Sequence, residues 1–329
     1  EKKKMASLPI EVVMTIILVG ILAVIGVLIT FQKTKPQLNQ TYHLIPSSFN
    51  PQKREYEIYA LSYTVVWIGI FAIVIILQMY EQFNENSYMI LCVSVSLPYL
   101  LQPIVAPLKT EKSLPLFQRY SFKANVWIFI FGFIGNYWYT HYFYRVLKAK
   151  YTFPAHRLND VPIALFFATH FYFITYHTFS NIILRMIETR YVKSFNRTVL
   201  FWVAVLAFSY FTAFMETLTI SSFPYYSFED RFMAYTLGSA FYGIYFIVSF
   251  PVFYRLDEKD AIVSDEVNYE KYLESKETLT KEFNKVKVYT LRETIMESMG
   301  TSMIVLLGLD FCRLLCGIEL KISGVLYYL

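Results

Sequence analysis

Charged residues and cysteines are scarce in this chain, and their scarcity limits the classes of protein to which the chain can belong. Only 17% of its 329 residues are Asp, Glu, Lys or Arg, whereas 56% are hydrophobic. The net charge of +5 includes no dense basic block, which argues against a nucleic-acid partner. The three cysteines lie in apolar runs without disulfide or metal-site spacing, so packing roles are predicted for them.

Histidines are also rare, and the usual catalytic motifs are missing. No two of the five histidines stand three or four positions apart, which excludes a histidine-rich di-iron desaturase or hydroxylase. The sequence contains no glycine-rich phosphate loop, GxSxG elbow or HExxH helix. Acid–base chemistry without a cofactor or metal, transport, or a structural role remain as options.

Long apolar runs dominate what is present. Eight segments are each long enough to cross a bilayer, at residues 10–31, 58–80, 87–108, 124–146, 161–186, 199–221, 232–254 and 295–315. The sequence therefore predicts an all-α, polytopic membrane bundle of about eight transmembrane helices. Basic residues are more numerous on the side that includes the charged segment 260–292, which predicts that this side is cytosolic.

Composition divides the chain into four parts. Residues 1–50 form an N-terminal transmembrane anchor and a polar linker, and residues 51–259 form the main membrane domain. Residues 260–292 form a charged cytosolic insert, and residues 293–329 contain the last transmembrane helix and the C-terminal segment.

Polar and ionisable residues inside the apolar runs are candidates for a functional site, because they are costly in a membrane. The stretch 123–145 is the most conspicuous, with Asn136 and His141 in its second half. We estimated the depth of each candidate from the direction of its predicted helix and a rise of about 1.5 Å per residue. Several further candidates then lie near the same membrane face. A single pocket is therefore predicted from several segments. Its candidates are His141, His170, Glu216, Tyr225, Tyr226 and Asp230.

Each of these candidates also has a structural interpretation. Asn136 is of a type that hydrogen-bonds between packed helices, and the histidines on the stripe of His170 and His177 allow the same explanation. Glu216 suits a buried partner for an arginine or histidine. Asp230 suits a cap for the helix that follows it, and the neighbouring tyrosines suit anchors at the membrane interface.

Several stretches of the chain are long and specific: KANVWIFIFGFIGNYWYTHYFYRVL (123–147), YTFP (151–154), NDVP (159–162), FFATH (166–170), YHTFSN (176–181), LAFSYFTAFMET (206–217), FPYYSFEDR (223–231) and FYGIYFIVSFPVFYRLDEK (241–259). Together they resemble a known family, the cycloeucalenol cycloisomerases. The resemblance covers roughly residues 54–259 and, more faintly, LGLDFCRLLCG at 307–317. It identifies residues 51–259 as an isomerase-like membrane domain.

The resemblance implies that the chain opens the cyclopropane ring of a cycloeucalenol-type sterol, giving an obtusifoliol-type product without cofactor or metal. Protonation of a strained carbon–carbon bond needs an acid that still holds its proton near neutral pH. Burial in an apolar pocket keeps a carboxyl group protonated, because desolvation disfavours the charged form. Glu216 is the predicted acid, with Asp230 as the next candidate. His141 or His170 is predicted to accept the proton or to keep Glu216 protonated.

The same reaction assigns binding roles. Aromatic faces stabilise a carbocation, and Trp138, Tyr142, Tyr225 and Tyr226 are predicted to line its site. Asn136 is predicted to bind the sterol hydroxyl or to orient His141. The implied partners are the sterol and membrane lipid. The implied location is the membrane of the endoplasmic reticulum, with a mitochondrial membrane as the alternative.

Two other functions compete with catalysis. Residues 1–50 and the insert 260–292 look added or lengthened relative to the family, and both suit docking to another protein. They motivate the alternative of a catalytically inactive, isomerase-derived subunit of a larger membrane complex. A sterol transporter or sensor is the second rival, although the sequence lacks the paired, interrupted halves of many secondary transporters.

Overall fold

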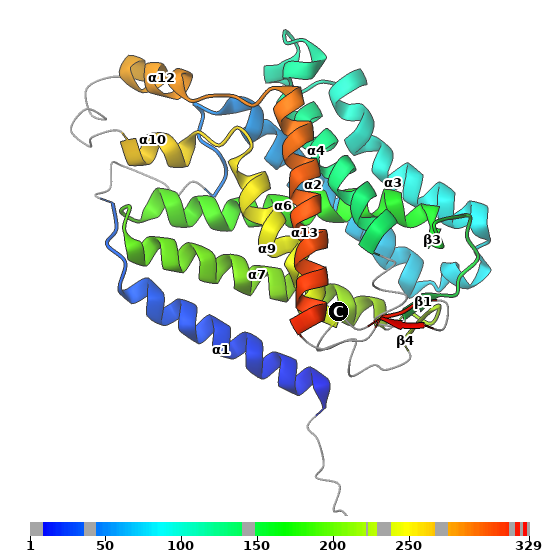
Figure 1. The fold of residues 1–329 in the computed structure, drawn as a ribbon. Coiled ribbons are helices and arrows are strands. Elements are labelled where there is room, and N and C mark those ends of the chain that lie inside the picture. Colours follow the sequence, from blue (N-terminus) through cyan, green and yellow to red (C-terminus); the bar gives the residue numbers. More distant parts are fainter. Residues whose placement is uncertain are drawn as a thin grey trace, which may run out of the picture.

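The computed structural model describes residues 9–35, 44–139, 149–221, 223–228, 238–266, 276–315, 320–322 and 325–327. Each predicted apolar segment contains a long helix (Figure 1). These helices are α1 (Ile10–Thr30), α2 (Pro51–Ile76), α3 (Glu85–Val105), α4 (Tyr120–Ile134), α6 (Ile163–Arg190), α7 (Phe195–Ser221), α9 (Ser239–Arg255) and α13 (Leu291–Leu315). The all-α prediction is therefore confirmed.

Short elements join the long helices. Three of them are 3-10 turns, η1 (Met79–Gln82), η2 (Lys109–Glu111) and η3 (Leu116–Gln118), and a π-helix, η4 (Gly135–Tyr139), continues α4. The strands form antiparallel pairs: β1 (Ala149–Tyr151) with β4 (Tyr226–Phe228), β2 (Arg157–Leu158) with β3 (Val161–Pro162), and β5 (Leu320–Ile322) with β6 (Val325–Tyr327). The helices α10 (Asp260–Glu266) and α12 (Lys276–Lys285) lie within the charged insert.

Five of the long helices are long and apolar enough to cross a membrane: α1, α2, α3, α7 and α13. The prediction of about eight spans is not confirmed for the other three. Among the described residues, α4 has 15 residues before the π turn that continues it, and α9 has 17. Residues 140–148 after this turn and residues 229–237 before α9 lie outside the described part of the chain. Helix α6 has 28 residues but carries many polar side chains, and these are tolerated because other helices surround it.

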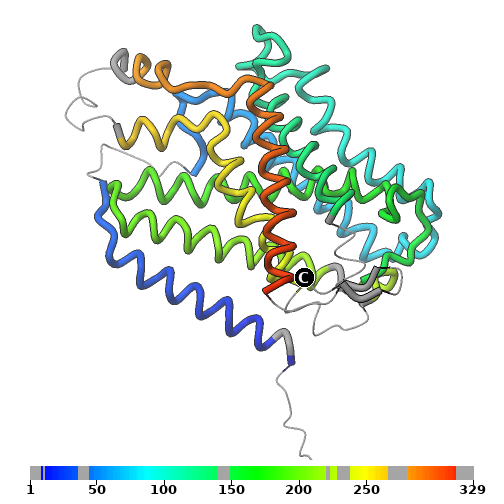
Figure 2. Tube along the Cα trace, in the orientation of Figure 1, coloured from blue at the N-terminus to red at the C-terminus, as the bar shows by residue number. Residues whose placement is uncertain are grey.

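Helix α6 forms the centre of the bundle. It packs against α2, α3, α4, α7 and α9. Figure 2 shows α6, α7 and α1 running side by side, with α13 crossing in front of α6 and α7. The main core beside α6 is rich in fully buried aromatic rings, among them Trp127 and Phe131 of α4 and Phe250 of α9. Such rings bury large apolar areas, which lets helices with few aliphatic side chains pack tightly.

A cluster of buried ion pairs joins α2 and α6 to the segment after α9. The Arg185 guanidinium lies 2.6 Å from one Glu57 carboxylate oxygen and 3.3 Å from Glu258, and Lys53 lies 2.9 Å from Glu258. These side chains are at most 3% exposed. Removing one member of such a cluster leaves an uncompensated buried charge, which typically costs about 3 to 5 kcal/mol.

The N-terminal segment and the charged insert both contact the bundle. Helix α1 packs along α7, and Lys35 just beyond it pairs with Asp265 of α10 at 2.7 Å. The ring of Phe283 in α12 stacks on Phe49 with centroids 5.1 Å apart. These segments are therefore packed parts of the fold, and whether they also dock another protein stays a prediction.

Candidate active site

A cavity of about 290 Å³ lies among α2, α3, α4, α6, α7 and α9. Its volume is close to the lower end of the range for ligand pockets, which is about 300 to 1,000 Å³. Most of the lining is apolar or aromatic. The lining residues are Phe71, Val74, Ile75, Tyr80, Phe83, Tyr88, Leu91, Cys92, Gly132, Gly135, Asn136, Tyr151, Phe153, Ala164, Leu165, Ala168, Thr169, Tyr172, Phe173, Glu216, Thr217, Thr219, Phe223, Tyr226, Gly238, Tyr242 and Tyr245.

Glu216 supplies the carboxyl group of this cavity. It stands near the end of α7, and its Oε2 accepts a hydrogen bond of 2.9 Å from the Tyr242 hydroxyl on α9. The Tyr176 hydroxyl on α6 is a second hydroxyl group near this carboxyl group. Within the described part of the chain, no lysine, arginine or histidine pairs with Glu216. Its described partners are neutral hydroxyls, so the carboxyl group can hold or release a proton without breaking an ion pair.

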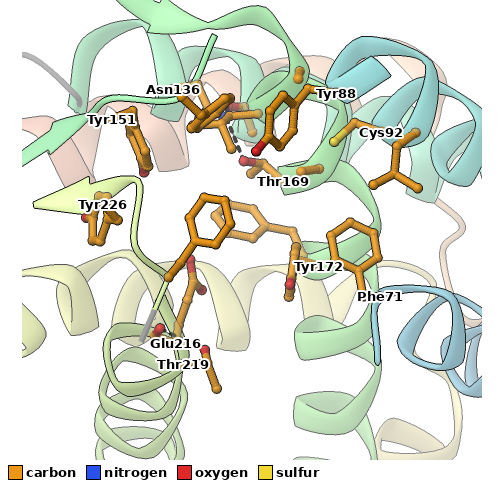
Figure 3. A pocket seen from close by; sticks show the side chains of 18 of the residues that line it. Phe71, Tyr88, Cys92, Asn136, Tyr151, Thr169, Tyr172, Glu216, Thr219 and Tyr226 are labelled. Atoms are coloured by element: carbon orange, nitrogen blue, oxygen red, sulfur yellow. Dashed lines mark hydrogen bonds between the residues drawn. The ribbon is translucent and has the colours of Figure 1, made fainter. Parts of the chain in front are cut away.

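A second polar group lies on the other side of the cavity (Figure 3). The Asn136 side chain in the π turn donates one N–H to the Thr169 hydroxyl and the other to the Gly132 carbonyl, both at 2.8 Å. Short π segments inside α-helices are often associated with functional sites. Two glycines allow the close approach of neighbouring helices here. A Cβ at Gly135 would lie 3.0 Å from the Tyr245 ring, and one at Gly132 would lie 3.3 Å from Thr169.

Aromatic side chains form much of the wall between these polar groups (Figure 3). Tyr172 and Phe71 contact each other from α6 and α2, with ring centroids 6.3 Å apart. Tyr151 and Tyr226 are register partners in the β1–β4 pair, and their rings lie 4.8 Å apart. The strand pair therefore brings together two loops that are distant in sequence. Aromatic side chains from several elements therefore line this part of the cavity.

Three of the predicted site residues line the cavity: Asn136, Glu216 and Tyr226. Tyr225 is absent from the lining, although its ring packs 5.6 Å from that of Phe223, which does line it. Trp138 also lies off the cavity and is 57% exposed, because the π turn directs it to the surface. His141, Tyr142 and Asp230 lie outside the described residues.

The prediction that His170 belongs to the pocket is not supported by its position. Its ring is buried on another face of α6, where Nε2 lies 2.9 Å from the Asn125 side-chain oxygen of α4. His177 similarly contacts Ser249 of α9 at 2.9 Å. The alternative explanation, hydrogen bonding between helices, therefore applies to both histidines. Position 170 lies about 100° further round the helix than Thr169, on the side of α6 that faces Asn125 of α4.

Sequence reasoning missed four cavity-side hydroxyl residues: Thr169, Tyr172, Tyr176 and Tyr242. Three of them share one face of α6 at positions 169, 172 and 176, a spacing of three and four residues. That spacing was the available signal. It is weak because tyrosines are common throughout this chain and suit membrane interfaces as well as a site.

No cluster of three or more metal-ligating side chains occurs among the described residues. The polar groups at the cavity are instead a carboxyl, an amide and several hydroxyls. Glu216 can donate or accept a proton in this cavity. The amide and hydroxyl groups can bind one polar group of a ligand that is otherwise apolar.

Comparison with known proteins gives one informative match. Over 273 residues the chain is 39% identical to a cycloeucalenol cycloisomerase of Arabidopsis thaliana, covering 82% of this chain and 88% of that protein. No protein-family model and no solved structure matches the chain. Identity of this extent, over most of both proteins, shows that the chain belongs to the cycloeucalenol cycloisomerase family.

Proposed function

We propose that this protein is a membrane-embedded sterol isomerase that opens the cyclopropane ring of a cycloeucalenol-type sterol. The product would be an obtusifoliol-type sterol with a ring double bond. Family membership supports the reaction class. The observation that carries the assignment of the site is the Glu216 carboxyl group, which lies in an aromatic-lined cavity with hydroxyl partners only among the described residues.

The proposed reaction moves one proton in and one proton out. The Glu216 carboxyl group gives its proton to the bridging cyclopropane carbon, and the electrons of the breaking carbon–carbon bond form the new C–H bond. That carbon becomes a methyl group, and a cation forms on the adjacent ring carbon. A neighbouring ring carbon then loses a proton to a base, and its C–H electrons form the double bond. Atoms and charge balance without redox, which is why no cofactor is proposed.

Three groups are candidates for the base that accepts this proton. The Glu216 carboxylate formed in the first step is one candidate acceptor, because it already faces the cavity. His141 and Asp230 are the other candidates, and both lie outside the described residues. Aromatic faces such as that of Tyr172 would stabilise the cation by about 1 to 2 kcal/mol each when water is excluded. The aromatic wall would also keep water from adding to the cation.

The test is a sterol assay in heavy water with the purified protein in nanodiscs. Wild-type protein is expected to convert cycloeucalenol to obtusifoliol carrying one deuterium on the newly formed methyl group, as read by mass spectrometry. Glu216→Gln is expected to lower turnover by about 10³-fold or more, because general acid catalysis typically contributes 10²- to 10⁴-fold. Retained activity within about tenfold, equal to about 1.4 kcal/mol, would move the acid role to Asp230.

Glu297→Gln is the matched control. Glu297 also lies in a long helix, is partly buried and accepts a hydrogen bond from a tyrosine, Tyr289, at 3.3 Å, but it does not line the cavity. This variant is expected to keep wild-type turnover. Absence of any conversion by folded wild-type protein, with the Arabidopsis enzyme active alongside, would favour the inactive structural subunit.

A further inference from the structure

Three threonines line the cavity, and they differ in where their hydroxyl protons go. Thr217 and Thr219 donate to carbonyl groups of their own helix at 2.9 to 3.0 Å. The Thr169 hydroxyl accepts the Asn136 N–H, and among the described residues its own proton has no acceptor. Thr169 is therefore the cavity threonine with a hydrogen bond left to donate.

The hydrogen bonding of the Thr169 hydroxyl differs from that of other threonines on the same helix. Thr175 and Thr178 on the same helix donate to the carbonyl four residues back, which is the ordinary behaviour of a helical threonine. At position 169, the Asn136 amide approaches the hydroxyl instead, and it is itself fixed by the Gly132 carbonyl. The missing side chain at Gly132 leaves room for this contact.

We propose that Thr169 donates a hydrogen bond to the hydroxyl oxygen of the sterol and so selects for a ring oxygen at that position. This inference rests on the proposed function. Asn136 acts as a positioning residue, because both of its N–H groups are committed within the protein. The Asn136–Thr169 pair and Glu216 lie on different sides of the cavity (Figure 3), so an anchored hydroxyl fixes which ring carbon meets the carboxyl group.

Three ligands test the direction of this hydrogen bond: cycloeucalenol, its ketone and its deoxy analogue. The ketone keeps an acceptor oxygen but loses the proton, and the deoxy analogue loses both. Wild-type protein is expected to use the alcohol and the ketone with similar kcat/KM and the deoxy analogue about tenfold less well, a typical value for one hydrogen bond. In Thr169→Val, which keeps the shape of the side chain, this preference is expected to disappear.

Three further variants separate recognition from general damage. Thr169→Ser is expected to keep the wild-type preference over the deoxy analogue, because serine retains the hydroxyl group. Thr219→Val removes a hydroxyl that bonds only to its own helix, and it is expected to leave the preference unchanged. Asn136→Ala is expected to weaken the preference for the alcohol while leaving kcat/KM for the deoxy analogue near the wild-type value.

The outcomes distinguish this inference from the function on which it rests. If wild-type protein converts no cycloeucalenol, the proposed function fails. If it converts the alcohol but Thr169→Val keeps the full preference over the deoxy analogue, the role of Thr169 is overturned and the function stands. Rejection of the ketone by wild-type protein would also overturn it, because the sterol hydroxyl would then be the donor.

Discussion

The hydroxyl of Tyr242 is expected to matter for turnover because it touches the carboxyl group that changes charge. It donates to Glu216 Oε2 at 2.9 Å, and hydrogen bonds to charged groups contribute about 1.5 to 3 kcal/mol. That range corresponds to roughly 10- to 150-fold in rate. Since Tyr176 remains as a second neighbour, we expect Tyr242→Phe to lower kcat by about 10- to 30-fold, in the lower part of this range.

The matched control is Tyr245→Phe, one turn along the same helix. The Tyr245 hydroxyl also lies at the cavity and is buried, but it donates to the Gly135 carbonyl at 3.3 Å and does not touch Glu216. Turnover of cycloeucalenol by each variant in nanodiscs is compared after equal thermal unfolding temperatures have been verified. The reasoning is refuted if Tyr242→Phe stays within threefold of wild type, or if both variants lose the same activity.

Two further predictions concern the charged end of the bundle. Arg185→Met should lower stability by about 3 to 5 kcal/mol, because Glu57 and Glu258 lose their shared partner, and adding Glu57→Gln should recover part of the loss in thermal unfolding. Burial alone would raise the pKa of Asp265, but the hydrogen bonds it accepts, from Arg197 first, outweigh burial and hold that pKa below its ordinary value of 3.8. A depressed carboxylate pKa stabilises the fold above the ordinary value and ceases to do so as pH falls through the folded pKa. Asp265→Asn should therefore lower the unfolding temperature most at pH 7, and the difference from wild type should shrink below about pH 3.8. If this difference did not change with pH, the ionised Asp265 carboxylate would not be the stabilising group.

The long helices were predictable because their cause is local. Apolar runs of bilayer length specify helix in lipid, where every backbone group must be bonded within the segment. What the sequence left open was how many of these helices have the length and composition to span. Helix α4 gives way to a π turn at Gly135, and helix α6 carries polar residues that only its central position explains. Both features depend on neighbouring helices and leave no periodic pattern.

The site was predictable in part, and helix α6 shows why. Sequence reasoning gave weight to His170 because an ionisable group in an apolar run is costly, but that cost is also met by hydrogen bonding to Asn125. The neighbouring Thr169 looked unremarkable, since a threonine hydroxyl usually bonds to its own helix. Only the contact with Asn136, in the π turn that follows α4, distinguishes Thr169 from other helical threonines. Glu216 was predictable because it is an ionisable residue in an otherwise apolar helix.

Glu57, Glu258 and Glu216 differ in whether their hydrogen-bond partners carry a charge. Glu57 and Glu258 have cations within 2.6 to 3.3 Å, whereas the described partners of Glu216 are tyrosine hydroxyls. Glutamine keeps the shape of glutamate and an oxygen that accepts from Tyr242, without a charge to desolvate. Glu216→Gln is therefore expected to leave the unfolding temperature unchanged or to raise it while abolishing turnover. Glu57→Gln, which deprives Arg185 of the nearer of its two charged partners, is expected to lower the unfolding temperature by several degrees. If Glu216→Gln were instead the more destabilising of the two, Glu216 would be a structural residue, and its role as the acid would have to be abandoned.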